Sequence, residues 1–213
     1  MTVLLAVAHG TRSAAGQAQI RGLVDRVALR RPDLDVRLAY VDVQEPRVGE
    51  VAVSPDTVIV PLLLSAGYHV RVDIAEAAAV SGARVAPPLG PDPVLVDGLR
   101  RHLTGGDAVV LAAAGSSDPA WRADIDRVAA ELGATVAYAS GTDRRVPEVV
   151  AHLREQGAER VTVAAYLLAE GLFYRALHSA GADRVTPPLC EDRAVVDLVA
   201  ARYADLTTTA GRL

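Results

Sequence analysis

The chain repeats itself, and this repetition constrains its fold more than any other feature of the sequence. Three segments of the first half recur in the same order in the second half, each displaced by roughly 100 positions. The paired segments are 7–12 with 112–117, 63–71 with 167–175, and 87–92 with 187–192. Three ordered matches with nearly constant spacing are hard to obtain by chance. The sequence therefore predicts two fused copies of one domain-sized unit, residues 1–104 and residues 105–213.

Within each copy, aliphatic and β-branched runs alternate with amphipathic segments. This alternation indicates βαβ units and a mainly parallel sheet. Strands are predicted over 2–8, 34–41, 57–64, 83–86, 108–113, 134–139, 160–166 and 184–186. Helices are predicted over 14–29, 72–80, 93–103, 119–132, 144–156, 171–180 and 193–204. The predicted fold class is α/β: two similar tandem domains, each a sheet flanked by helices, with a cleft between them.

Composition excludes several classes of protein. The chain is 51% hydrophobic and 23% charged, so it can bury a core. Its apolar runs are far shorter than the ~20 residues that cross a bilayer, and we expect no signal peptide. The single cysteine, Cys190, excludes an intrachain disulfide and a cysteine-rich zinc module. The net charge is −4, without a basic stripe. We expect a cytoplasmic protein that binds neither membranes nor nucleic acid.

Two histidines mark a candidate site. His9 directly follows the first predicted strand, and His69 follows the central one. In an open parallel sheet, ligands bind beyond the carboxyl ends of the strands, so both imidazoles are expected at one edge. The second copy carries Ala114 and Phe173 at the matching positions. The pattern suggests a reactive N-terminal copy and a C-terminal copy that serves as a wall or lid.

A pair of imidazoles suits two chemical tasks. Neutral imidazole binds divalent iron, cobalt or nickel. With a pKa of ~6.5, it also accepts protons near neutral pH. The chain has no H-x-x-x-H, H-E-x-x-H or C-x-x-C spacing, which argues against a closed zinc site. The residues are consistent with a loose site that holds a metal in transit.

Three motifs of the first copy carry a family resemblance. They are Ala-His-Gly-Thr-Arg at 8–12, Asp-Val-Gln-Glu-Pro at 42–46, and the run from Pro61 to Ile74 that contains Ser-Ala-Gly-Tyr-His. They resemble the class II chelatases of the sirohydrochlorin chelatase family, which insert a metal into a tetrapyrrole in sirohaem and cobalamin biosynthesis. The resemblance covers the whole chain, because the family includes fused two-copy members as well as single-copy homodimers.

The resemblance implies a sirohydrochlorin ferrochelatase or cobaltochelatase. In such an enzyme His9 and His69 bind the metal and accept pyrrole protons. A carboxylate from the 42–45 segment assists them; Glu45 is the candidate, with Asp42 as the alternative. No permanent cofactor is implied, because the divalent metal (Fe²⁺, Co²⁺ or Ni²⁺) is itself a substrate. The family's helix after this segment is expected to be short, because Ser54-Pro55 interrupts it.

The tetrapyrrole carries many carboxylates, so an acidic protein needs local cations and hydrogen-bond donors. Arginine pairs carboxylates through two parallel hydrogen bonds. The candidate substrate-binding residues are Thr11, Arg12, Ser65, Tyr68 and Arg71. Because the fused copies already supply two lobes, we expect a monomer with an internal pseudo-two-fold axis.

Simpler interpretations remain for some of these residues. Arg175 matches Arg71 in the copy that lacks the histidine pair, which favours a structural role for that position. Glu45 is also explained as an acid at a helix start. Two other functions remain open. A phosphohydrolase would use His9 as a nucleophile, although histidine phosphatases place an arginine where this chain has Ala8. A carrier would bind the metal or the tetrapyrrole without catalysis.

Overall fold

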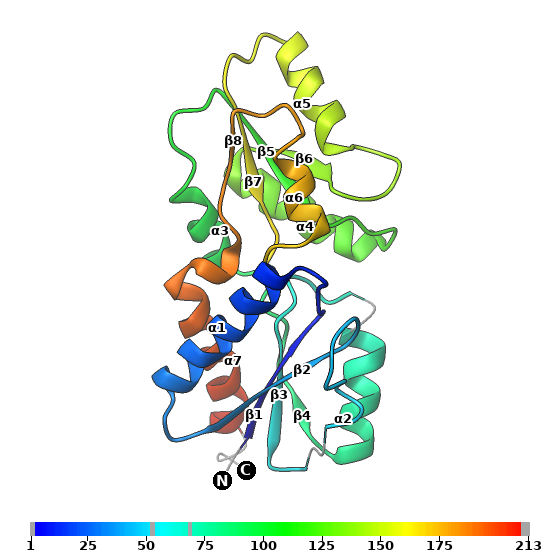
Figure 1. Cartoon of the computed structure of the whole chain (residues 1–213), viewed down its shortest axis with the longest axis vertical. Helices are drawn as coiled ribbons and strands as arrows, with labels where there is room; N and C mark the ends of the chain where they lie inside the picture. Colours follow the sequence, from blue (N-terminus) through cyan, green and yellow to red (C-terminus); the bar gives the residue numbers. More distant parts are fainter. Residues whose placement is uncertain (1–2, 52–53, 68–69, 210–213) are drawn as a thin grey trace. The chain divides into compact units, whose positions relative to one another are not determined.

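The computed structural model describes residues 3–51, 54–67 and 70–209. They form two four-stranded sheets, ordered β2-β1-β3-β4 and β6-β5-β7-β8, and every strand pair is parallel. Helices flank each sheet, as Figure 1 shows. The predicted α/β fold class, with one parallel sheet in each copy, is confirmed. Among the described residues no helix has the length and apolar character needed to span a bilayer.

The elements alternate along the chain as predicted. The first copy contains β1 (Val3–Ala8), α1 (Ala14–Arg30), β2 (Asp35–Tyr40), β3 (Thr57–Pro61), the π-helix η1 (Val70–Ile74), α2 (Ala75–Ser81), β4 (Arg84–Val85) and α3 (Pro93–Arg100). The second copy contains β5 (Ala108–Ala113), α4 (Pro119–Leu132), β6 (Thr135–Tyr138), α5 (Val146–Glu155), β7 (Val161–Ala165), α6 (Leu172–Leu177), β8 (Arg184–Val185), the 3₁₀-helix η2 (Leu189–Glu191) and α7 (Arg193–Thr209).

The two compact units exchange their final helices. Unit 1 comprises residues 1–90 and 193–213, and unit 2 comprises residues 91–192. Helix α7 therefore belongs with the first sheet, where it contacts α1 and β3, and α3 belongs with the second sheet, where it contacts α4. The division into 1–104 and 105–213 stays a prediction about the duplicated sequence. The compact units differ from it because each copy's last helix packs in the other unit.

The core of unit 1 follows from the alternation of side chains along its strands. Leu5, Val7 and Ile59 point to the face of the sheet that packs against Ile74 and Ala77, at the start of α2. Helices α1 and α7 contact each other as well as β2 and β3 respectively. The apolar face of α1, predicted from its 3.6-residue period, is buried at Ile20, Leu23, Val24 and Val27.

The segment between the second and third strands differs between the copies. In unit 2 it contains α5, whose Val146 and Val150 cover the sheet together with Tyr174 and Leu177. In unit 1 residues 47–51 form turns and an isolated bridge in place of the short helix that was expected. Gly49 occupies the place of Pro147, which starts α5 with a φ angle already suited to a helix. Within the described residues before β3, the loop that carries Asp42 and Glu45 is therefore not followed by a regular helix.

Asp183 fixes the start of β7 in unit 2 and offers a test of the fold. Its carboxylate accepts hydrogen bonds from Val161 N at 2.7 Å and from Arg154 Nη2 at 2.6 Å, and both interactions lower its pKa, the backbone N–H more strongly. A carboxyl whose pKa is lower in the folded state stabilises above its unfolded pKa of ~3.9. This contribution disappears as the pH falls through the folded value.

We therefore expect Asp183→Asn to lower the thermal unfolding midpoint at pH 7. The difference from the wild type should shrink as the solution is acidified and disappear in strong acid. Unfolding followed by circular dichroism at several pH values measures this. A difference that stays constant into acid would show that the charge of Asp183 is unimportant to the fold.

Candidate functional site

The loops that follow β1 and β2 remain paired beyond the ends of their strands. Val41 N donates to the Ala8 carbonyl at 3.0 Å, and Asp42 N donates to the His9 carbonyl at the same distance. The β1 and β2 strands are in parallel register up to Ala8 and Tyr40, so these bonds join the two loops directly beyond the strand ends. As a result, His9 and Asp42 follow adjacent strands, β1 and β2, at the same edge of the sheet.

Gly10 makes this close approach possible. Its φ angle is +95°, in a region that side chains rarely adopt. A Cβ atom at this position would lie 2.1 Å from the carbonyl oxygen of Asp42, far inside van der Waals contact. The next residue after Asp42, Val43, also has a positive φ of 66°, which is unusual for a β-branched side chain and is typical of functional loops.

Thr11 joins the two loops and the helix behind them. Its backbone N–H donates to Gln44 Oε1 at 2.9 Å, and its carbonyl accepts from Gln17 Nε2 on α1 at 2.9 Å. Its hydroxyl oxygen accepts from Ser13 N at 3.1 Å, and Ser13 in turn caps α1 by accepting from Gly16 N. Thr11 was predicted to bind substrate; in the structure each of these groups holds the His9 loop in place.

His9 itself is exposed at the edge of the sheet. Its Nδ1 lies 3.3 Å from the Gly10 carbonyl oxygen, and when Nδ1 carries the proton, Nε2 carries the lone pair that can bind a metal. Asp42 lies close enough for its charge to interact with that of His9. The Val43 N–H, then Arg47 and His9, hold the pKa of Asp42 below its usual range, so the carboxylate is anionic at neutral pH.

Glu45 is engaged within its own loop. Its Oε2 accepts from the Arg47 backbone N–H at 2.9 Å, and its Oε1 accepts from Arg47 Nε at 3.2 Å. A hydrogen bond shared with Glu50, followed by those from Arg47, lowers the pKa of Glu45. The pKa values of both acids are lowered, so basicity does not distinguish them; the interaction of Asp42 with His9 favours Asp42 as the acid that works beside this histidine.

The other predicted site residues are placed only in part. Ser65 is half-buried in the loop that follows β3, the neighbour of β1 in the sheet, and Arg12 is exposed beside the His9 loop. Tyr68 and His69 lie outside the described residues, and of Arg71 only the backbone, within η1, is described. Within the described residues no three His, Cys, Asp or Glu side chains gather as a metal site.

The matching edge of unit 2 has the same loop arrangement with different side chains. Gly115 has a φ of +105°, and a Cβ there would lie 2.9 Å from the Ser140 carbonyl oxygen, just as Gly10 approaches Asp42. Arg122, on α4, takes the place of Gln17 and donates to the Ser116 carbonyl at 2.7 Å. It also binds both carboxylate oxygens of Asp143, at 2.7 and 3.2 Å. The second copy therefore keeps the braced loops and lacks the imidazole.

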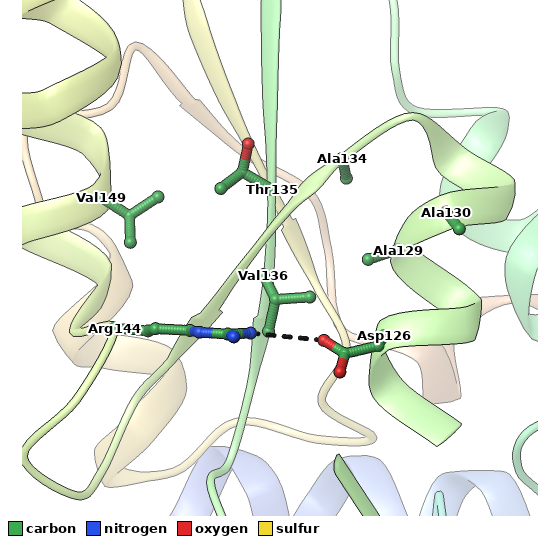
Figure 2. Close-up of a pocket in the computed structure, with 8 residues that line it drawn as sticks. All are labelled: Asp126, Ala129, Ala130, Ala134, Thr135, Val136, Arg144 and Val149. Atoms are coloured by element: carbon green, nitrogen blue, oxygen red, sulfur yellow. Dashed lines mark hydrogen bonds and ion pairs between the residues drawn. The ribbon is translucent and has the colours of Figure 1, made fainter. Parts of the chain in front are cut away.

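A pocket of about 410 Å³ lies in unit 2, beside the edge strand β6. Figure 2 shows that its wall consists mainly of small apolar side chains, with the Asp126–Arg144 ion pair across one end. The ion pair measures 3.3 Å. Its lining, without a histidine or a cluster of acids, gives it no part in the metal chemistry predicted above.

Comparison with known proteins decides the family. The CbiX family model matches the chain twice, over residues 3–105 and over residues 108–206. The chain belongs to the CbiX family. The family model therefore occurs twice along the chain. No curated protein matches the chain.

Solved structures share the fold of this CbiX-family chain along its whole length. SirB from Bacillus subtilis, solved with Fe³⁺, is 19% identical with a TM-score of 0.80, over 100% of this chain and 98% of that one. CbiX described as the terminal enzyme of siroheme biosynthesis in denitrifying bacteria is 22% identical, with a TM-score of 0.72 over 95% and 98%. The sirohydrochlorin chelatase SirB from Bacillus subtilis subspecies spizizenii, in complex with cobalt, is 20% identical, with a TM-score of 0.71 over 95% and 94%.

The polar residues that brace the site were not predicted from the sequence. Gln17 and Gln44 act through hydrogen bonds to backbone groups of Thr11, and no spacing in the sequence shows such contacts. Arg47 lies directly after the Glu-Pro pair of the second motif, and its reach to both acids depends on the turn that follows. One signal was available: Ser13 precedes an amphipathic run, which is typical of a helix N-cap.

Proposed function

We propose that the protein inserts a divalent metal, Fe²⁺ or Co²⁺ with Ni²⁺ as a further candidate, into sirohydrochlorin. The observation that carries the proposal is the pairing of the His9 loop with the Asp42 loop at the edge of a CbiX-family sheet. Similar folds solved with Fe³⁺ and with cobalt support a metal as the substrate. Family membership favours this reaction over the phosphohydrolase alternative.

Metal insertion requires the exchange of two pyrrole protons for one divalent ion. In our proposal His9 and His69 hold the metal through neutral imidazole nitrogens, which bind divalent iron, cobalt and nickel without the tight grip of thiolates. The released protons pass to the imidazoles and to the nearby carboxylate. We assign that carboxylate to Asp42, because both oxygens of Glu45 accept hydrogen bonds from Arg47.

The remaining predicted residues act on the substrate's rim. Arg12 and Arg71 are proposed to pair with carboxylates of the tetrapyrrole, and Ser65 and Tyr68 to donate hydrogen bonds to it. Thr11 is proposed to act mainly through the loop that it braces. We further propose that the chain acts in the cytoplasm as a monomer, since its two copies are already fused.

The absorption spectrum of sirohydrochlorin tests the proposal. Under anaerobic conditions, we expect catalytic amounts of the protein to accelerate the spectral change of metal insertion with Fe²⁺ or Co²⁺ over many turnovers. A carrier would bind the tetrapyrrole stoichiometrically and leave its spectrum metal-free. A chromogenic phosphate ester offered in parallel tests the phosphohydrolase alternative. Release of phosphate without metal insertion would contradict the proposal.

A further inference from the structure

Arg47 contacts both candidate acids of the site at once. Its Nη1 donates to Asp42 Oδ1 at 3.2 Å and to the Val41 carbonyl at 3.3 Å, while its Nε donates to Glu45. The side chains of Arg47 and Asp42 are 39% and 54% exposed, so the pair lies where a ligand can reach it. A permanent positive charge therefore lies within hydrogen-bond distance of the carboxylate nearest His9.

We infer that Arg47 is a positioning residue that limits how tightly the site holds its divalent metal. The inference rests on the proposed function, in which His9 is a metal ligand and Asp42 is the carboxylate beside it. When the metal at His9 also interacts with Asp42, it shares that carboxylate with the guanidinium, which competes for its oxygen lone pairs. The guanidinium also repels the incoming cation.

Limited affinity suits a metal that must be passed on. A site that transfers its ion to a tetrapyrrole needs ligands that release it. Tighter binding of the ion by the protein stabilises the state before transfer, and this added stability raises the barrier to transfer. Arg47 also gives Asp42 and Glu45 a partner before the metal arrives and after it leaves. In the absence of metal, this pairing offsets the repulsion between the two anionic side chains of the loop.

The second copy provides a matched position without the metal chemistry. Arg145 takes the place of Arg47: each forms an isolated bridge with the tyrosine that ends the preceding strand. The backbone N–H of each donates to a glutamate three residues later, at 3.3 Å to Glu148 and 3.1 Å to Glu50. The Arg145 guanidinium, however, donates to the Gly141 carbonyl at 3.0 Å, and Ser140 occupies the place of Asp42.

The test measures the affinity of the full chain for Co²⁺ in the absence of tetrapyrrole, by equilibrium dialysis or by the Co²⁺ absorption bands. We expect Arg47→Gln to bind Co²⁺ about three- to tenfold more tightly, since exposed charge pairs contribute modestly. Single-turnover transfer of the bound Co²⁺ to sirohydrochlorin should slow by a similar factor. Arg145→Gln should change neither quantity.

Two further variants separate charge from packing. Arg47→Lys keeps the charge and loses the forked geometry, so it should bind Co²⁺ as the wild type does. Arg47→Met keeps the aliphatic stem and loses the charge, so it should bind more tightly, as Arg47→Gln does. If circular dichroism shows that Arg47→Gln fails to fold, Arg47→Met provides the measurement of Co²⁺ affinity without the charge.

Weaker or unchanged Co²⁺ binding in both neutral variants would overturn the inference and leave the proposed function standing. Equal weakening in Arg47→Lys and Arg47→Gln would overturn it as well, because it would show that Arg47 orients Asp42 for the metal. Failure of the proposed function has a different signature: a wild-type protein that binds no Co²⁺, or a His9→Ala variant that binds it unchanged.

Discussion

His9→Ala is expected to lower the rate of metal insertion by at least about a hundredfold, the size of effect seen when one acid–base group is removed from an active site. In the proposed mechanism, the imidazole is both a metal ligand and a proton acceptor, so its loss removes two contributions at once. Because His9 is exposed and follows the end of β1, the fold should persist. The measurement is the initial rate of the sirohydrochlorin spectral change with Fe²⁺ and with Co²⁺.

His152→Ala is the matched control for this variant. His152 is also exposed, but it lies on α5 in the second unit, where its ring contacts Gln156. Its removal should leave the insertion rate at the wild-type value. We expect His69→Ala to behave as His9→Ala does. Wild-type rates in both histidine variants would show that the pair takes no part in the reaction.

Gly10→Ala is expected to disable the site by separating its two loops. The added methyl group would lie 2.1 Å from the Asp42 carbonyl oxygen, and the φ of +95° is unfavourable for alanine. To accept the methyl group the loops must move apart, which disturbs the hydrogen bond from Asp42 N to the His9 carbonyl. We expect a loss of about 2–4 kcal/mol in the free energy of unfolding and loss of Co²⁺ binding.

Two glycine variants serve as controls for the effect of Gly10→Ala. Gly22 lies on α1, and a Cβ there meets nothing within 4 Å, so Gly22→Ala should stabilise the helix by up to about 1 kcal/mol. Gly115→Ala disturbs the equivalent loop of the second copy, where the Cβ would lie 2.8 Å from Ser140 Oγ. It should destabilise the protein and retain Co²⁺ binding. Wild-type stability and binding in Gly10→Ala would contradict the role given to this contact.

The sequence was sufficient to predict the class of fold and the edge of the sheet where His9 lies. The apolar run of β1 and the helical period of α1 are local patterns. The residues that these patterns predict to be buried are buried in the structure. The internal repeat identified the two copies that the family model also matches. The position of His9 directly after a buried strand was enough to put it at the carboxyl edge.

The arrangement of the acids was not predictable from the same patterns. Asp42 and Glu45 are three positions apart, and only the turn after β2 determines that Arg47 contacts both. The exchange of α3 and α7 was equally hidden. Both helices are amphipathic and follow equivalent strands. The apolar face of a helix indicates that it packs against a sheet, but it does not indicate which of the two sheets.

The exchanged helices also govern the order in which the protein can be completed. As the ribosome releases the chain, β1 to β4 emerge before the second unit, yet α7, which packs on α1 and β3, emerges after it. The half that carries His9 therefore cannot complete its packing until the whole of the second unit has been synthesised. A gene split between the copies would make two polypeptides, each carrying a helix that the other needs.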